Sequence, residues 1–288
     1  MRLTTLLQLG RASNLPTVWS NVIAATVLAG AALQDLRLMI MLFAMSLLYV
    51  GGMALNDAFD AAYDARHRPE RPIPSGRLSR GLVFALGFGC LAAGALLLVG
   101  TGAWGGVGFE AALAALALVA CIVWYDWRHK GTACSPLLMG LIRFLVYLGT
   151  ALGFVGSVPL PVLLGALALM SYIIGLTYIA RQENLRRLKQ TWPLGFLLAT
   201  SAYLIAIGQG EPWAWLLWLV WNLWVLFALK LLINPAPGDI PRAVARLIAG
   251  VALLDAVLVA ATARPDIAAV VLLCFGVTLL LQRRIASS

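Results

Sequence analysis

The sequence predicts an all-α membrane protein, a polytopic bundle of nine or ten transmembrane helices, and three observations support this fold class. Hydrophobic residues make up 62% of the 288 residues and charged residues only 11%, whereas charged residues average about 25% of soluble domains. The mean hydropathy is +0.91. Apolar runs long enough to cross a bilayer lie at 15–33, 36–55, 81–100, 106–124, 137–156, 159–179, 192–208, 212–233, 243–263 and 266–282.

The shortest of these runs leave the count between nine and ten. The runs at 192–208 and 266–282 hold about 17 residues each, which is the lower limit for a span, and a segment of that length can also be re-entrant. The polar segments between the runs are too short to fold as separate soluble domains. We therefore expect a single membrane domain over residues 1–288.

Lysine and arginine are distributed unevenly among the connections. Basic clusters follow the second, fourth and sixth apolar runs, and the first of them includes Arg66, Arg68 and Arg71, whereas the intervening connections hold only Arg37 and Arg264. The positive-inside rule then predicts an integral protein of the cytoplasmic (inner) membrane with both termini and all large loops in the cytoplasm. The net charge of +9 comes from these short loops, so it does not indicate nucleic-acid binding.

The acidic stretch after the second run is the main candidate site. If the preceding helix continues through it, Asn56, Asp60 and Asp64 repeat every four residues and share one face, with Asp57 beside them. Carboxylates this close repel one another unless a cation lies among them, and Mg²⁺ prefers oxygen ligands of this kind together with substrate phosphates. The alternative is a solvated polar loop that caps a membrane helix, which the regular spacing disfavours.

Two further polar clusters are predicted on the same cytoplasmic face. Residues 125–130 follow the fourth run and residues 178–184 follow the sixth, so the three clusters could converge on one cavity walled by apolar helices. Together with a bound cation, the basic residues of these loops favour a phosphate-rich anion, and a diphosphate is the simplest candidate. The group that a diphosphate leaves behind is an electrophile, and inside a membrane a long isoprenoid chain is the natural candidate. A dry cavity beside the diphosphate would protect the allylic cation of such a chain from water.

Several motifs resemble the UbiA superfamily of intramembrane prenyltransferases. The pattern from Asn56 to Asp64, followed by Arg-Pro-Ile-Pro-Ser-Gly at 71–76, is similar to the first aspartate-rich motif of that family. Arg11 and Asn21 near the first span, Tyr125 with Lys130, and Thr191-Trp192-Pro193 extend the resemblance to about residue 195. The resemblance implies an all-helical bundle around a central cavity, Mg²⁺ held between two aspartate-rich motifs, and transfer of a prenyl group from its diphosphate to an acceptor.

The second acidic motif departs from the family pattern. Glu183 is its only carboxylate, and Tyr178 and Arg181 occupy neighbouring helical positions. An arginine there could replace a cation beside a diphosphate, since its planar fork suits phosphate oxygens. With Met139-Gly140 and Arg143, this segment resembles the EboC branch of the superfamily.

The resemblance and the residue chemistry together give a set of expected site residues. Asn56, Asp60, Asp64 and Glu183 are expected to hold the metal, and Asp60, Asp64, Lys130 and Glu183 are expected to be catalytic. Substrate binding is expected of Arg11, Asn21, Asn56, Asp57, Arg66, Tyr125, Arg143, Tyr178 and Arg181.

Three residues inside or near the apolar runs have competing interpretations. Arg143 is a functional candidate because it lies within a run, although its shallow depth would also let it snorkel to the interface. Asp255 lies near the middle of a run, and a structural pair with a cation such as Arg246 is favoured over catalysis. His129 has no second metal ligand at a suitable spacing, which favours a solvated side chain.

The function predicted on this basis is a Mg²⁺-dependent intramembrane prenyltransferase. Its substrates would be a prenyl diphosphate and a small acceptor, with an aromatic acceptor among the options. The alternative is a non-catalytic membrane carrier or scaffold that binds a lipid phosphate, which the single carboxylate of the second motif favours. Transfer of a phosphoribosyl group to a polyprenyl phosphate uses similar ions and also stays open.

Overall fold

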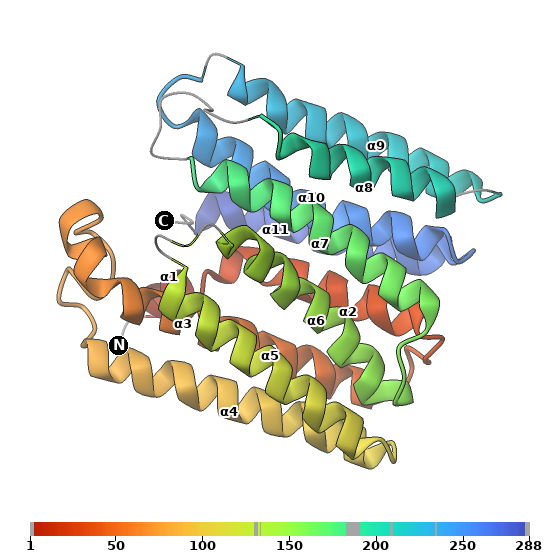
Figure 1. Cartoon of the computed structure of the whole chain (residues 1–288), viewed down its shortest axis with the longest axis horizontal. Coiled ribbons are helices and arrows are strands. Elements are labelled where there is room, and N and C mark those ends of the chain that lie inside the picture. The colour runs from red at the N-terminus through yellow and green to blue at the C-terminus, as the bar shows by residue number, and fades with distance from the viewer. Residues whose placement is uncertain are drawn as a thin grey trace.

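The chain forms a bundle of long, roughly parallel or antiparallel helices (Figure 1). The computed structural model describes residues 3–129, 132, 134–182, 191–207, 210–233 and 235–285, and this part contains no β-strand. Its helices are α1 (Leu3–Leu9), α2 (Pro16–Leu28), α3 (Arg37–His67), α4 (Arg80–Trp104), α5 (Gly108–Arg128), α6 (Ser135–Val155), α7 (Leu160–Ala180), α8 (Leu194–Ile207), α9 (Pro212–Leu229), α10 (Asp239–Ala260) and α11 (Pro265–Arg284), with short 3₁₀ turns η1 (Ala12–Asn14) and η2 (Lys230–Leu232).

Each of the ten predicted apolar runs corresponds to one helix, from α2 to α11. Eight of these helices in the described part of the chain are long and apolar enough to cross a membrane. The other two are α2, with 13 residues, and α8, with 14. The doubt about the run at 192–208 is therefore justified, whereas the run at 266–282 forms the 20-residue helix α11. The helix formed by the first run is shorter than the run itself, because α2 ends at Leu28 and the chain turns at Gly30, whose φ is +70°.

The outside of the bundle is apolar, as a bilayer requires. Leu96 on α4, Phe109 on α5 and Leu198 on α8 are each more than 70% exposed. In Figure 1, α4 lies at one edge of the bundle and α8 and α9 lie at the opposite edge. Large apolar side chains that face outward on so many helices match a hydrocarbon surrounding, and the protein is an integral membrane protein.

Helices α2 and α10 lie at the centre of the bundle, and most of their side chains are buried. α10 is the most buried of the eight spans, with 78% of its apolar window inside the bundle. The short helix α2 packs against α10, α11, α6 and α3. Side chains on α2 and α10 can therefore reach each other and the interior rather than the lipid.

Close contact between α3 and α4 fixes the helix that carries the acidic stretch. Gly51 on α3 lies so near α4 that an added Cβ would come within 2.9 Å of the Gly87 carbonyl oxygen. At Gly87, an added Cβ would meet the side chain of Leu55 at 2.6 Å. Small residues let membrane helices approach in this way, so the position of α3 is determined one turn before Asn56.

Helix α3 continues through the whole acidic stretch, as the sequence predicts. It ends at His67, and the chain turns back at Arg68, which has φ −145°. The following loop packs Leu78 against Leu9, Ala54 and Ala58 in a small apolar cluster. This cluster holds the loop against the last turns of α3.

Candidate functional site

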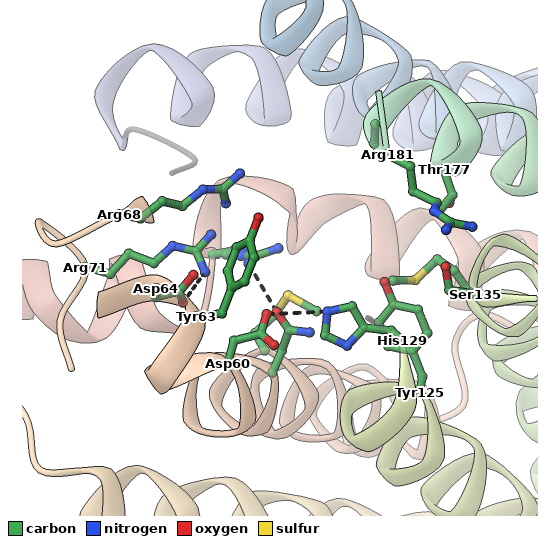
Figure 2. Close-up of a pocket in the computed structure, with 15 residues that line it drawn as sticks. Asp60, Tyr63, Asp64, Arg68, Arg71, Tyr125, His129, Ser135, Thr177 and Arg181 are labelled. Atoms are coloured by element: carbon green, nitrogen blue, oxygen red, sulfur yellow. Dashed lines mark hydrogen bonds and ion pairs between the residues drawn. The ribbon is translucent and has the colours of Figure 1, made fainter. Parts of the chain in front are cut away.

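The last turns of α3 line a cavity of about 470 Å³, which we call the outer cavity (Figure 2). Other walls come from the segment before α2, from the end of α5, and from the facing parts of α6 and α7. Its lining residues are Arg11, Met53, Asn56, Asp60, Tyr63, Asp64, Arg68, Arg71, Tyr125, His129, Ser135, Met139, Thr177, Ala180 and Arg181.

The acidic face of α3 points into this cavity. Asn56, Asp60 and Asp64 all line it, so the four-residue spacing predicts their shared face correctly. Their exposed fractions are 7%, 8% and 2%, and that of the neighbouring Asp57 is 6%. Buried carboxylates need cations or hydrogen-bond donors nearby.

Arg71 supplies the nearest positive charge. Its Nη1 lies 2.8 Å from Asp64 Oδ2 and 3.3 Å from Asp57 Oδ1. The side chain is itself buried, with an exposed fraction of 4%. The loop fold that brings it back is closed by a hydrogen bond from the Leu78 amide to the Pro72 carbonyl, at 3.1 Å. Spacing alone did not separate Arg71 from the other arginines of this loop, because the contact depends on how the loop turns.

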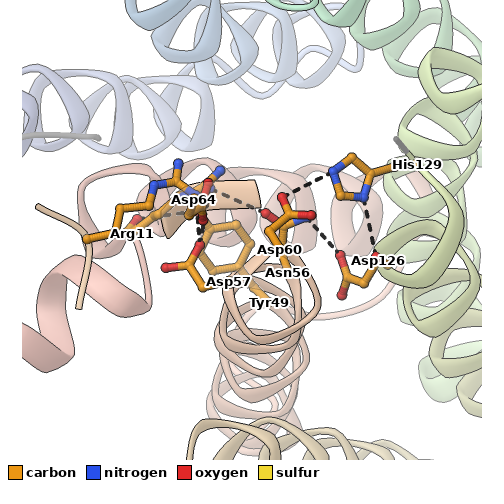
Figure 3. A network of polar contacts seen from close by, with 9 residues as sticks. Arg11, Tyr49, Asn56, Asp57, Asp60, Asp64, Asp126 and His129 are labelled. Carbon is orange, nitrogen blue, oxygen red and sulfur yellow. Dashed lines mark hydrogen bonds and ion pairs between the residues drawn. The ribbon is translucent and has the colours of Figure 1, made fainter. Parts of the chain in front are cut away.

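Arg11 approaches the same group from the N-terminal segment (Figure 3). Its Nη2 lies 3.4 Å from Asn56 Oδ1 and 3.6 Å from Asp57 Oδ1. Arg11 adopts a left-handed backbone with φ +41°, and its carbonyl accepts a hydrogen bond from Tyr49 at 3.2 Å. Burial lowers the pKa of the guanidinium, but the charge of Asp57 and other nearby groups raises that pKa above its ordinary value. Arg11 therefore remains charged.

His129 is a member of the site that sequence reasoning missed. The prediction of a solvated side chain is wrong: His129 lines the outer cavity, its side chain is only 16% exposed, and its Nε2 lies 3.4 Å from Asp60 Oδ2. The ring stacks on Tyr125 with centroids 5.0 Å apart. Tyr125 lines the cavity as expected. The spacing of these two residues, four apart at the end of α5, was the available signal.

Asp126 is a second residue without an assigned role in the prediction. Its Oδ1 accepts a hydrogen bond from Asn56 Nδ2 at 3.3 Å, as Figure 3 shows. Its Oδ2 is buried and has no hydrogen-bond partner in the described part of the chain. Asp126 therefore orients the Asn56 amide so that the amide oxygen faces Arg11.

The remaining predicted residues fall into three groups. Arg181 lines the outer cavity from α7 (Figure 2). Arg66 is exposed and does not line the outer cavity. It follows Asp64 by two residues, so its side chain points about 200° around the helix from that of Asp64. Tyr178 packs edge-on against Trp192, with centroids 5.2 Å apart, and does not line the outer cavity either. Lys130 and Glu183 lie outside the described residues.

A second cavity, which we call the inner cavity, has a volume of about 280 Å³ and shares part of its wall with the outer one. It is more apolar on one side, where α7 and α10 contribute aliphatic residues. Its lining residues are Arg11, Asn14, Tyr49, Met53, Arg68, Arg71, Tyr125, Met139, Arg143, Ile173, Leu176, Thr177, Ala180, Pro241, Val244, Ala245, Ile248 and Val251.

Arg143 and Asn21 meet next to the inner cavity. Arg143 Nη1 donates to Asn21 Oδ1 at 2.7 Å, and Nη2 donates to Thr17 Oγ1 at 3.1 Å. Asn21 is fully buried and lines neither cavity. Asn21 thus contacts Arg143, another of the expected site residues.

Asp255 is also part of this buried polar group, and its predicted pairing with Arg246 is wrong. Its carboxylate accepts hydrogen bonds from Ser20 Oγ at 2.5 Å, Asn21 Nδ2 at 2.8 Å and Tyr147 Oη at 2.5 Å. Arg246 instead donates to the Phe227 carbonyl. Nine residues separate positions 246 and 255 on α10, a rise of about 13 Å, which a side chain does not span.

The donor chemistry of the outer cavity suits a hard divalent cation. The Asn56 amide oxygen and the carboxylates of Asp60 and Asp64 are oxygen donors on one helix face. No group of three or more histidine, cysteine, aspartate or glutamate residues among the described positions is close enough to hold a metal unaided. An ion here would therefore need further oxygens from a ligand, as Mg²⁺ takes from phosphates.

The sequence of the chain is similar to a known protein family and to several named proteins. A model of the UbiA prenyltransferase family matches residues 15–248. Digeranylgeranylglyceryl phosphate synthase of Methanopyrus kandleri is 35% identical over 159 residues, which are 54% of this chain and 54% of that protein. The protein of the same name from Methanothrix thermoacetophila is 40% identical over 96 residues, 31% of this chain and 36% of its own length. The chain thus matches about half, or less, of the length of these relatives.

Solved structures share the arrangement of helices over nearly the whole chain. A UbiA homologue from Aeropyrum pernix K1 superposes with a TM-score of 0.66 at 17% identity, covering 86% of this chain and 96% of that one. A structure described as digeranylgeranylglyceryl phosphate synthase in membranes gives a TM-score of 0.61 at 17% identity, covering 89% and 97%. At such identity the likeness concerns the fold alone. The family match, the fold and the acidic face of α3 agree, and the chain belongs to the UbiA prenyltransferase family.

Proposed function

We propose that this chain is a Mg²⁺-dependent intramembrane prenyltransferase that moves an isoprenoid group from a prenyl diphosphate to an acceptor. One observation carries the proposal: buried oxygen donors and several arginines line one cavity, and this cavity borders a second one that has an apolar wall. The oxygen donors, with a bound cation, and the arginines suit a diphosphate, and the apolar wall suits a hydrocarbon chain. The names of the relatives support a prenyl transfer.

The transfer has a simple electron balance. The bond between C1 of the prenyl chain and the diphosphate oxygen breaks, and its electron pair leaves with the diphosphate. A nucleophilic atom of the acceptor forms a bond to C1 and loses its proton. The site must therefore stabilise negative charge on the leaving group and keep water away from C1.

Residues of this chain have separate parts in that reaction. Asn56, Asp60 and Asp64 would hold Mg²⁺, which supplies positive charge to the diphosphate oxygens. Arg11 and Arg181 line the same cavity and donate to the diphosphate. Lys130 and Glu183 are proposed to complete the far side of the site, as the family resemblance implies.

The names of the relatives suggest which substrates to test first. They describe a product with two geranylgeranyl groups on glyceryl phosphate. Geranylgeranyl diphosphate is therefore the first donor and geranylgeranylglyceryl phosphate the first acceptor, with a small aromatic acid as the second acceptor. We propose that the site faces the cytoplasm, because the basic loops lie at this end of the helices.

The test is diphosphate release by the purified protein in Mg²⁺ from geranyl, farnesyl and geranylgeranyl diphosphates. Asp60→Ala is expected to lower the rate by about a hundredfold or more, the usual loss when a charge-stabilising group is removed. Asp266→Ala is the matched control, since this exposed carboxylate pairs only with Arg264 in the described part of the chain. Wild-type protein that neither binds nor consumes any prenyl diphosphate, with Asp60→Ala behaving identically, would refute the proposal.

A non-catalytic carrier of a lipid phosphate is the second candidate. The pairing of Asp57 and Asp64 with Arg71, and of Asp57 with Arg11, favours it, because these guanidinium groups offset the carboxylate charges without a metal. A carrier would bind the prenyl diphosphate and release no diphosphate over the whole panel of chain lengths.

A further inference from the structure

We propose that the inner cavity contains a second anion-binding subsite, independent of Mg²⁺, in which Arg143 binds the phosphate or carboxylate group of an amphiphilic acceptor. Asp255 and Asn21 act as positioning residues that hold Arg143 in place. The assignment to an acceptor rests on the proposed prenyl transfer, whereas the anion subsite itself can be tested without it.

The lining of the inner cavity has an unbalanced charge. It contains the side chains of Arg11, Arg68, Arg71 and Arg143 and no aspartate or glutamate among the described residues. Two of these arginines already face the carboxylates of the α3 motif. Arg143 does not, and it is the arginine that belongs to the inner cavity without also lining the outer one.

Arg143 makes only neutral contacts in the described part of the chain. Its hydrogen bonds go to the Asn21 amide oxygen and to the Thr17 hydroxyl and carbonyl oxygens. Its guanidinium also lies 5.9 Å from the ring centroid of Tyr49. The charge of Asp255 reaches Arg143 only across the Asn21 amide, without direct contact between the two side chains. A guanidinium beside a membrane cavity with no carboxylate in direct contact can therefore bind an anionic ligand.

Asp255 determines the direction of the Arg143 side chain through one intermediate residue. The carboxylate accepts from the Asn21 Nδ2 group, so the Asn21 oxygen must face the other way, toward Arg143. A neutral amide with both of its ends bound in this manner has only one orientation. Asp255 thus fixes the Asn21 amide, and Asn21 in turn fixes Arg143.

The rest of the inner cavity indicates what the anion is attached to. Ile173 and Leu176 from α7, and Val244, Ile248 and Val251 from α10, form an apolar wall. An alkyl or prenyl chain can lie against these residues while its charged group contacts Arg143. The ligand class is therefore an amphiphile with a single anionic head.

The geometry separates this subsite from the diphosphate site. Asn56, Asp60 and Asp64 line the outer cavity only, and Arg143 lines the inner cavity only. Ligands bound through these two sets of groups should therefore respond to different substitutions and differently to Mg²⁺.

The experiment measures binding of dodecyl phosphate to the full-length protein in detergent micelles with EDTA present. Arg143→Gln is expected to weaken binding by about tenfold or more, the value of a charge-assisted hydrogen bond. Geranylgeranyl diphosphate in Mg²⁺ should bind Arg143→Gln within about threefold of wild type, whereas Asp60→Ala should show the reverse pattern. Inorganic phosphate is the arm that distinguishes a free ion from a lipid headgroup, and it should bind more weakly than dodecyl phosphate. Arg246→Gln is the matched arginine control, because Arg246 lines neither cavity.

Asp255→Asn tests the positioning role. It should weaken dodecyl phosphate binding in the wild-type background and cause no further loss in Arg143→Gln, since a residue that acts through Arg143 has no separate effect. If Asp255→Asn does not fold, Asn21→Asp serves instead: its carboxylate would occupy Arg143 and weaken the same binding.

Three results would overturn the inference. They are wild-type protein that does not bind dodecyl phosphate in EDTA, an Arg143→Gln variant that binds it normally, and an Arg143→Gln variant that loses both ligands equally. The last result would assign Arg143 to the diphosphate site. Failure of the proposed function would be seen separately, as absence of diphosphate release and of Mg²⁺-dependent binding of geranylgeranyl diphosphate.

Discussion

Buried carboxylates at two places in this bundle, Asp57 with Asp64 and Asp255 alone, differ in their surroundings. Asp57 and Asp64, near the end of α3, are paired with the guanidinium groups of Arg11 and Arg71. Asp255, on the most buried helix, is surrounded by neutral donors from other helices. The first group lines or borders a cavity, and the second lies in fully packed interior.

The difference indicates which carboxylates can change partners. A pair with an arginine on a loop can open when a metal ion or phosphate offers a replacement charge, because both partners lie beside a cavity. Hydroxyl and amide donors fixed on the two helices α2 and α6 have no such freedom, and loss of their acceptor leaves polar groups unpaired inside the membrane. The first arrangement suits ligand exchange, and the second suits a fixed scaffold.

The largest effect is expected from Asp255→Leu. This change leaves the donors of Ser20, Asn21 and Tyr147 without their acceptor, and the free energy of unfolding should fall by about 3–5 kcal/mol. The measurement is reversible denaturation of the purified protein in mixed micelles. A loss below about 1 kcal/mol, which is the value of a single ordinary hydrogen bond, would contradict the view that this network is structural.

A smaller effect, dependent on metal, is expected from Arg71→Met. Removing Arg71 leaves two buried carboxylates close together, which should cost about 2–4 kcal/mol in EDTA. Mg²⁺ at millimolar concentration should restore part of that loss, because a cation that binds the native state stabilises it by mass action. The measurement is the Mg²⁺-induced shift in Tm of the variant and of wild type. Equal shifts in the two proteins would show that Arg71 and the metal do not compete.

Tyr147→Phe probes one of the three donors to Asp255. The Ser20 and Asn21 donors remain, so the free energy of unfolding should fall by about 1–2 kcal/mol. The same denaturation assay checks this value. A loss as large as that of Asp255→Leu would mean that the Tyr147 bond alone holds the network.

The smallest effect is expected at the exposed ion pair of Arg264 and Asp266. Its Nη2–Oδ2 distance is 2.8 Å, yet solvent screens such pairs strongly. Asp266→Asn should leave Tm unchanged within error in both EDTA and Mg²⁺. A clear shift would show that distance matters more than burial in this protein, against the comparison drawn above.

Sequence patterns predicted the helices and the acidic face well for identifiable reasons. Apolar run length is a direct consequence of bilayer thickness, and α3 carries its polar residues at an interval that helical geometry converts into one face. The positions of Asp60, Asp64, Arg11 and Arg181 at one cavity agree with the family resemblance. These features depend on local spacing or on a recognisable motif.

Features that depend on tertiary packing were not predictable in the same way. The return of Arg71 to α3 depends on the apolar contacts of Leu78, and the contact between His129 and Asp60 depends on how closely α3 and α5 pack. The partners of Asp255 come from α2 and α6, more than a hundred residues away in sequence. No local pattern encodes such distances.

The length of α3 also determines how a ligand would enter the site. Its 31 residues extend about 46 Å, whereas the hydrocarbon core is about 30 Å thick. A helix near the membrane normal that starts at Arg37 therefore leaves the hydrocarbon near Asn56. The acidic face then lies at the level of the phospholipid headgroups. The proposed prenyl diphosphate substrate would then reach it by lateral diffusion in the leaflet, with its chain in the lipid and its charge at the surface, and would not have to leave the membrane.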